Sequence, residues 1–171
     1  IFQEPMTSLN PYLRVGTQVA EAIMCHRKVS KSEAKQRVLE LFELVHLPMP
    51  EQAYSKYPHE FSGGQLQRIM IAMALINEPD ILIADEPTTA LDVSVQKEVL
   101  TLIKDLQKQH NLAVLFITHD FSVVEEMADN VAVMKNGKIV VPEDLVAGNG
   151  KHIEMHNRTL ELVRKTYGVV V

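Results

Sequence analysis

Cysteine, long apolar runs and clustered positive charge are all scarce in this sequence. The 171 residues contain one cysteine, Cys25, which excludes an intramolecular disulfide and is consistent with a reducing compartment. No stretch approaches the ~18 uninterrupted apolar residues that mark a membrane-spanning helix. The net charge is −5 and no lysine and arginine cluster occurs, which argues against a nucleic-acid-binding protein.

The composition fits one globular domain. Apolar residues make up 46% of the chain and charged residues 23%, so extensive disorder is not expected. The sequence begins Ile1-Phe2-Gln3-Glu4-Pro5, without an initiator methionine, and the apolar pair is typical of the end of a strand. We therefore expect the chain to be a fragment of a longer protein.

The first sixty residues have a helical pattern and no strand signal. Apolar residues at helical spacing predict a helix over about 13–24. Ser30 and Glu33 form a capping-box pattern that opens a second helix, which Pro48 and Pro50 should end. One face of this second helix should be buried, through Ala34, Val38, Leu41, Phe42 and Val45.

After residue 60 helices and strands alternate, which predicts an α/β fold with a largely parallel sheet. A helix over 64–77 is apolar on most sides. The apolar runs 81–84 and 113–117 are typical of buried parallel strands. Between them, Asp92 or Ser94 should cap a helix, and a further short helix should span 121–128. The pair Asn136-Gly137 then predicts a hairpin between 131–134 and 138–141.

The segment Ser62-Gly63-Gly64-Gln65 precedes the first helix of this α/β part. Two glycines allow a ligand to approach the backbone closely, and the helix N-terminus offers free N–H groups with a partial positive charge. The segment therefore predicts an anion site to which Ser62 adds a hydroxyl. The alternative is an ordinary loop before a capped helix.

Asp85 and Glu86 follow the strand over 81–84. Ligands of open α/β sheets lie beyond the carboxyl ends of the strands, and neighbouring residues of a strand point in opposite directions. Asp85 should therefore hold Mg²⁺, through a water molecule, while Glu86 orients and deprotonates an attacking water. The alternative is that both acids cap the next helix, with Pro87 at an early helical position.

His119 and Gln3 also follow expected strand ends. His119 could bind a terminal phosphate and stabilise charge in the transition state, and Gln3 could contact the metal or the attacking water. Taken alone, His119 could equally be a structural residue and Gln3 an ordinary surface residue. The fixed order of all these groups in one chain favours the joint interpretation.

These motifs closely resemble those of the ATP-binding subunits of ABC transporters. Phe61–Gln65 looks like the signature motif, Ile81–Glu86 like Walker B, and Ala90-Leu91-Asp92 like the D-loop. His119 looks like the switch histidine and Gln3 like the Q-loop glutamine. The likeness covers about residues 1–141. Stretches around Gln3–Pro11 and Tyr57–Phe61 most resemble the dipeptide and oligopeptide importers, with their nickel and glutathione relatives.

The resemblance implies a P-loop NTPase-like core with an inserted helical subdomain. Residues 1–60 would be the Q-loop and helical subdomain, 61–141 the core carrying the other motifs, and 142–171 a weakly patterned tail. Two such ATPase domains would sandwich two ATP molecules. The four signature residues Ser62, Gly63, Gly64 and Gln65 would act on the ATP of the second ATPase subunit. Asp85, Glu86, His119 and Gln3 would act on the chain's own ATP and Mg²⁺, and Asp92 would link the sites.

The implied partners include more than the second ATPase subunit. Transmembrane permeases would dock on the helical subdomain, and a solute-binding protein outside the membrane would be an indirect partner. The subunit would lie at the cytoplasmic face of the membrane, and no nucleic acid would bind. The alternatives are a soluble ABC-type ATPase acting on nucleic acid or ribosomes, and a non-catalytic interaction module.

One element of the family is missing from the sequence. No G-x-x-x-x-G-K-[ST] phosphate loop occurs, so we expect this chain alone to bind ATP poorly and to hydrolyse none. We also expect an apolar sheet face to be left uncovered.

Three residue-level expectations concern positions outside the motifs. In the tail, His152 and His156 are spaced for one helix face and could bind a metal, although a solvated helix is the simpler interpretation. Cys25 should be buried as a small apolar residue. Arg68 should form an ion pair in a subunit interface or be a surface charge.

Overall fold

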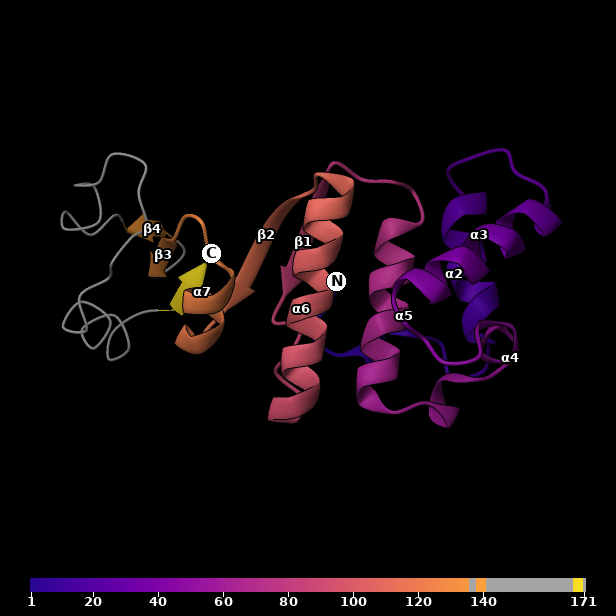
Figure 1. The fold of residues 1–171 in the computed structure, drawn as a ribbon, viewed down its shortest axis with the longest axis horizontal. Coiled ribbons are helices and arrows are strands. Elements are labelled where there is room, and N and C mark those ends of the chain that lie inside the picture. The colour runs from indigo at the N-terminus through magenta and orange to yellow at the C-terminus, as the bar shows by residue number, and fades with distance from the viewer. Residues whose placement is uncertain (136–137, 141–167, 171) are drawn as a thin grey trace. The chain divides into compact units, whose positions relative to one another are not determined.

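The computed structural model describes residues 1–135, 138–140 and 168–170. The chain divides into two compact units, residues 1–114 and 115–171, and each is described separately below. Figure 1 shows the order of the elements along the chain.

The first unit begins with a small helical bundle. Helices α2, α3 and α4 pack on one another, and α2 and α3 also pack on the following helix, α5. The bounds of the elements up to α5 are α1 Pro5–Ser8, α2 Val15–Met24, α3 Lys31–Leu44, α4 Pro50–Tyr54, a 3₁₀ turn Pro58–Glu60 and α5 Gly63–Leu75. The short helices α1 and α4 were not predicted, because each begins at a proline in a segment without apolar periodicity.

Helix α3 begins as predicted but ends earlier. The side chain of Ser30 accepts a hydrogen bond from the Glu33 amide, so the serine half of the expected capping box forms. The helix ends at Leu44, four residues before Pro48, and His46 then adopts a left-handed backbone with φ of 54°. Ala34, Val38, Phe42 and Val45 are fully buried, whereas Leu41 is only half-buried.

Strand β1, Ile81–Asp85, contradicts the expectation of a strand buried on both faces. Leu82 and Ala84 are buried, but Ile81 is 63% and Ile83 51% exposed. The expectation of an uncovered apolar face is therefore confirmed for this strand. Both backbone groups of Ile1 bond to β1: its nitrogen donates to the Ile83 carbonyl at 2.6 Å, and its carbonyl accepts from the Asp85 amide at 3.0 Å. This is the pattern of a parallel pairing.

Helix α6, Val93–His110, follows β1, and strand β2, Ala113–Thr118, follows α6. Figure 1 shows α6 running beside α5. The side chains that α6 buries are Val99, Leu100, Leu102, Ile103 and Leu106. At the start of β2, the Ala113 amide donates to the Asp80 carbonyl at 3.0 Å, which aligns the beginnings of the two strands.

The second unit contains antiparallel pairings. Its remaining elements are α7 Phe121–Met127, β3 Ala132–Lys135, β4 Lys138–Val140 and β5 Gly168–Val170. Strands β3 and β4 form the predicted hairpin. Strand β5, which was not predicted, pairs with both β2 and β3. The possible helix over 153–165, with His152 and His156 near its start, lies outside the described residues.

Cys25 is exposed, which contradicts the expectation that it is buried. It is the C-cap residue of α2, where the chain turns away from the bundle. The helix ends at Met24, as its spacing predicted, so the error lay in assigning Cys25 to the core from its residue type alone.

Candidate functional site

Glu86 and Gln3 lie in contact at the carboxyl end of β1. Gln3 Nε2 donates to Glu86 Oε2 at 2.8 Å. Thr89 Oγ1 donates to the same oxygen at 3.0 Å. The parallel pairing of Ile1 with β1 brings Gln3 to this strand end. Two residues that are 83 positions apart in the sequence are thus joined at one carboxylate.

The backbone of Glu86 is left-handed, with φ of 45°. This region is unfavourable for a residue with a Cβ and costs on the order of 1 kcal/mol or more, so the surroundings must hold it. The hydrogen bonds from Gln3 and Thr89 do so on the side chain. Strained backbone of this kind is concentrated at functional sites.

Asp85, the last residue of β1, has an exposed side chain next to Glu86. Among the described residues no group of three or more histidine, cysteine, aspartate or glutamate side chains could hold a metal ion. Mg²⁺ does not require such a group, because one or two carboxylates, water molecules and substrate phosphates usually bind it. An exposed carboxylate at a strand end therefore fits a metal that arrives with a phosphate ligand.

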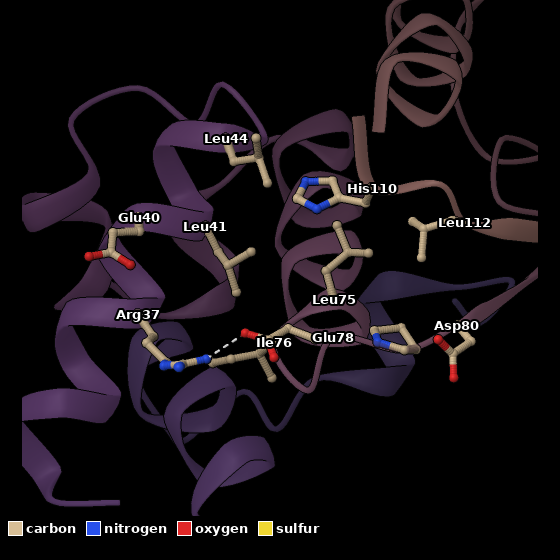
Figure 2. Close-up of a pocket in the computed structure, with 11 residues that line it drawn as sticks. Arg37, Glu40, Leu41, Leu44, Leu75, Ile76, Glu78, Asp80, His110 and Leu112 are labelled. Carbon is tan, nitrogen blue, oxygen red and sulfur yellow. Dashed lines mark hydrogen bonds and ion pairs between the residues drawn. The ribbon is translucent and has the colours of Figure 1, made fainter. Parts of the chain in front are cut away.

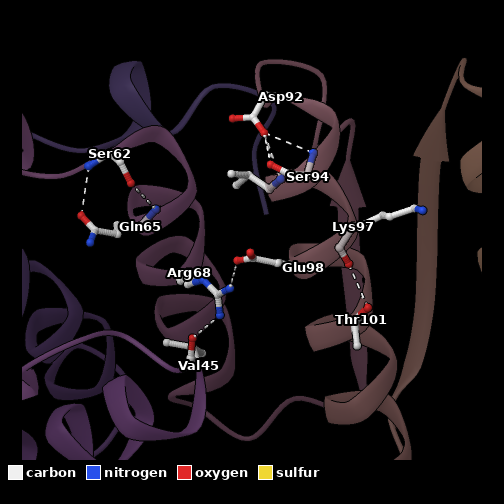
Figure 3. Close-up of polar contacts among 10 residues, drawn as sticks. Val45, Ser62, Gln65, Arg68, Asp92, Ser94, Lys97, Glu98 and Thr101 are labelled. Carbon is white, nitrogen blue, oxygen red and sulfur yellow. Dashed lines mark hydrogen bonds and ion pairs between the residues drawn. The ribbon is translucent and has the colours of Figure 1, made fainter.

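The glycine pair forms the first turn of α5, capped by Ser62 (Figure 3). Ser62 Oγ accepts from the Gln65 amide at 3.3 Å, and Gln65 Oε1 accepts from the Ser62 amide at 3.0 Å. This reciprocal capping box fixes the first turn. Ser62 and Gly63 are exposed residues, and Gly63 is the first residue of the helix, where the backbone amide has no partner within the helix.

Gly64 permits close packing between α5 and α6. A Cβ on Gly64 would lie 2.4 Å from Cγ1 of Val95, which no side chain tolerates without movement. A Cβ on Gly63 would lie 3.5 Å from Cδ2 of Leu91, an ordinary contact. The loop from Glu86 to Asp92 therefore begins at the Gln3–Glu86 contact and ends against the glycine pair.

Asp92 is the N-cap of α6, which decides between the two predicted caps. Its Oδ1 accepts from the Ser94 amide at 3.2 Å, the Ser94 hydroxyl at 2.7 Å and the Val95 amide at 3.1 Å. The Ser94 hydroxyl, followed by the Val95 amide, lowers the pKa of Asp92 below its ordinary 3.8. Asp92 is therefore held as a carboxylate at the start of α6 (Figure 3).

Arg68 connects three elements instead of forming an isolated surface charge. Its Nη1 donates to the carbonyl of Val45, just after α3, at 2.9 Å, and its Nη2 pairs with Glu98 of α6 at 3.0 Å (Figure 3). Only 13% of its side chain is exposed. Arg68 therefore forms an ion pair, as one of the two expectations held, but with a residue of its own chain, and the alternative of a plain surface charge is wrong.

His119 belongs to the second unit and is described there. It is exposed and directly follows β2. The next residue, Asp120, caps α7 by accepting from the Ser122 amide at 2.9 Å and its hydroxyl at 2.7 Å. That His119 shares a site with Glu86 stays a prediction.

Thr89 is the site residue that the sequence reasoning overlooked. Its hydroxyl binds the same Glu86 oxygen as Gln3 does. A hydroxyl three residues after a carboxylate, with a proline between them to bend the chain, was the available signal.

Comparisons of sequence and of structure both relate this chain to the ABC transporter family. The sequence pattern of the ABC transporter family matches residues 1–89. The oligopeptide transport ATP-binding protein OppD of Bacillus subtilis is 58% identical over 140 residues, which are 82% of this chain and 39% of OppD. The glutathione import ATP-binding protein GsiA of Escherichia coli is 54% identical, over 82% of this chain and 22% of GsiA. The chain thus spans well under half the length of these curated relatives.

A solved structure shares the fold. The ATP-binding cassette MJ0796, in a dimeric post-hydrolysis state bound to ADP and Pi, superposes with a TM-score of 0.68 at 33% identity. The match covers 81% of this chain and 59% of the cassette. The α/β ABC ATPase fold predicted from the motifs is confirmed, and the chain belongs to the ABC transporter family.

Proposed function

We propose that this chain supplies part of the ATP-hydrolysing subunit of an importer for peptides or related small solutes. The supporting observation is the Gln3–Glu86 hydrogen bond of 2.8 Å at the carboxyl end of β1. Relatives named for oligopeptide, dipeptide and glutathione transport support the substrate class. The capped N-terminus of α5, at which Ser62 and Gly63 are exposed, supports nucleotide binding by the same unit.

In this proposal Glu86 orients the water that attacks the γ-phosphate of the chain's own ATP and accepts its proton. Gln3 and Thr89 both donate to Oε2 of Glu86 and so hold the carboxylate in a fixed orientation at the strand end, where it would act as the base. Asp85, together with Gln3, would hold Mg²⁺, which when bound neutralises phosphate charge. His119 would donate a hydrogen bond to the terminal phosphate.

The signature residues act on a second nucleotide. Ser62, with its hydroxyl, and the amides of Gly63, Gly64 and Gln65 form the positive end of α5. We propose that this end meets the ATP of a second ATPase subunit across a two-fold interface. Asp92, at the other end of the loop from Glu86, would couple the two nucleotides.

The proposed location is the cytoplasmic face of a membrane, with permease subunits as direct partners and a solute-binding protein as an indirect one. The relatives are named as ATP-binding proteins of transport systems. Among the described residues, none of the helices combines the length and hydrophobicity that crossing a bilayer requires. Attachment through other subunits is consistent with that finding.

The test uses a chimera, because the sequence contains no phosphate loop. The part of B. subtilis OppD upstream of its match is joined to this chain, and phosphate release is measured with Mg²⁺-ATP. The chimera should turn over ATP, Glu86→Gln should reduce kcat at least about 100-fold, and Glu43→Gln, an exposed acid on α3, should leave it unchanged. The 171-residue chain alone should release no phosphate. Full activity of the Glu86→Gln chimera would contradict the proposal.

A further inference from the structure

A hollow lies in the first unit, lined by residues from α3, α5, α6 and the segment before β1. It has a volume of about 260 Å³ (Figure 2). None of the residues proposed for nucleotide binding lines it. The first turns of α5 and α6 form the candidate nucleotide site, whereas this pocket is lined by the last turns of those helices.

The floor of the pocket is apolar. Leu75, Ile76 and Leu112 are buried beneath it, and Leu41 and Leu44 of α3 form a half-buried wall (Figure 2). The spacing of α3 predicted that Leu41 would be buried with the bundle core. Its partial exposure leaves apolar surface that no described residue covers.

The rim of the pocket carries a small excess of negative charge. Arg37 pairs with Glu78 at 2.8 Å and Arg27 pairs with it at 3.1 Å, so these three side chains together carry one positive charge, against the two negative charges of Glu40 and Asp80. These hydrogen bonds, the one from Arg37 first, lower the pKa of Glu78. Glu40 and Asp80 lie on opposite sides of the pocket in Figure 2, and within the described part of the chain neither forms an ion pair.

Three helices also end at the pocket. Helix α3 ends at Leu44, α5 at Leu75 and α6 at His110, and all three residues line it. The carbonyl end of a helix carries about half a negative charge. Arg68 binds one of these carbonyls, that of Val45, and Gln36 Nε2 donates to Glu40 Oε1 at 3.0 Å, but the field of the three helix ends still adds to that of the carboxylates of Glu40 and Asp80. The pocket is thus apolar at its base and attracts cations at its rim.

We propose that this pocket receives an apolar side chain flanked by lysine or arginine from a helical segment of a partner protein. The volume of about 260 Å³ is below the roughly 300–1,000 Å³ of small-molecule sites, which favours an anchoring side chain over a free metabolite. An apolar anchor gains most of its binding free energy by desolvation. Lysine or arginine residues next to the anchor in the partner would pair with Glu40 and Asp80. These pairs would favour a basic partner over an acidic one.

The test titrates three capped, alanine-based helical peptides into the 171-residue chain. The first carries a central leucine with lysines on either side, the second replaces the lysines by glutamate, and the third replaces the leucine by alanine. Binding is followed by the leucine methyl resonances of Leu41, Leu44, Leu75 and Leu112 in NMR spectra. The first peptide should shift these signals, and the other two should bind at least about 10-fold more weakly.

Variants of the chain complete the test. The double substitution Glu40→Lys and Asp80→Lys should weaken the lysine peptide at least about 10-fold, whereas Glu21→Lys, at an exposed acid of α2, should not. The milder pair Glu40→Gln and Asp80→Asn gives a second measurement if the lysines disturb folding. Equal binding of the acidic peptide, or no shift with the lysine peptide, would overturn the proposal. Shifts of the same signals with protein concentration alone would also overturn it, since a second copy would then be the occupant.

Discussion

Helix α5 and strand β1 are both strongly apolar in sequence, yet they are buried very differently. Leu66, Ile69 and Ile71 of α5 are completely buried, because the bundle lies against the helix on one side and α6 on another. In β1 every second side chain is exposed. An apolar run in the sequence therefore indicates that its side chains favour burial. Whether they are buried in the structure depends on which other elements pack against them.

The largest difference in stability is expected between alanine substitutions of two isoleucines, one buried in α5 and one exposed in β1. Ile71→Ala, at a position with no exposure, should lower the free energy of unfolding by about 2–5 kcal/mol, because it removes buried contacts and leaves a cavity. Ile83→Ala, at a residue that is 51% exposed, should cost about 1 kcal/mol or less. Urea unfolding of the 171-residue chain measures both values. Equal losses would mean that β1 is covered in solution.

The second prediction concerns the close contact of α5 with α6. Gly64→Ala should destabilise the chain by about 1–3 kcal/mol, because the new methyl group would overlap the stiff side chain of Val95. This exceeds the gain of up to about 1 kcal/mol that alanine brings to a helix. Gly63→Ala, with an ordinary contact of 3.5 Å, should be neutral or stabilising.

A double substitution isolates the cause of the Gly64→Ala effect. In a variant that already carries Val95→Ala, Gly64→Ala should lower the free energy of unfolding much less than it does in the original chain. A double-mutant cycle measures this difference as a coupling energy between the two positions. Independent losses from the two substitutions would show that the overlap is not the reason.

Structural features that depend on residues close together in the sequence could be predicted from it, whereas most features that depend on distant residues could not. Ser30 and Asp92 cap helices where local patterns indicated, because a cap is made within three residues. The meeting of Gln3 with Glu86 was expected only through the order of strand ends. The exposure of Ile83 and the contacts of Arg68 depend on distant elements, which no local pattern contains.

The third prediction concerns Arg68. Arg68→Met keeps the apolar stem but leaves the Val45 carbonyl without its donor, and it should cost about 1–3 kcal/mol. Glu98→Gln removes only the charge of an exposed partner and should cost under about 1 kcal/mol. Thermal unfolding of both variants compares them. A larger loss for Glu98→Gln would show that the ion pair with α6 contributes more to stability than the contact with the Val45 carbonyl does.

The smallest effect on stability is expected from the protonation of two carboxylates at low pH. The pKa values of Asp92 and Glu78 are lowered in the folded chain, from 3.8 and 4.5. Their contribution is therefore complete above these ordinary values and is lost as pH falls through the lower folded values. Asp92→Asn should flatten the fall of Tm below about pH 4, since asparagine still caps the helix without titrating. An unchanged Tm profile would contradict the assignment, and Asp105→Asn on the same helix provides the control.

The central claim, that one chain acts on two nucleotides, is tested most directly by mixing two inactive chimeras. One carries Ser62→Arg in the signature turn and the other Glu86→Gln at the end of β1. If Ser62 acts on the partner's ATP and Glu86 on its own, the mixed dimer contains one site with both defects and one intact site. The account predicts that mixing restores substantial ATP hydrolysis, up to about a quarter of that of the unmodified chimera, if pairing is random and the sites act independently. A mixture that is confirmed to contain mixed dimers and yet remains as inactive as its components would contradict it.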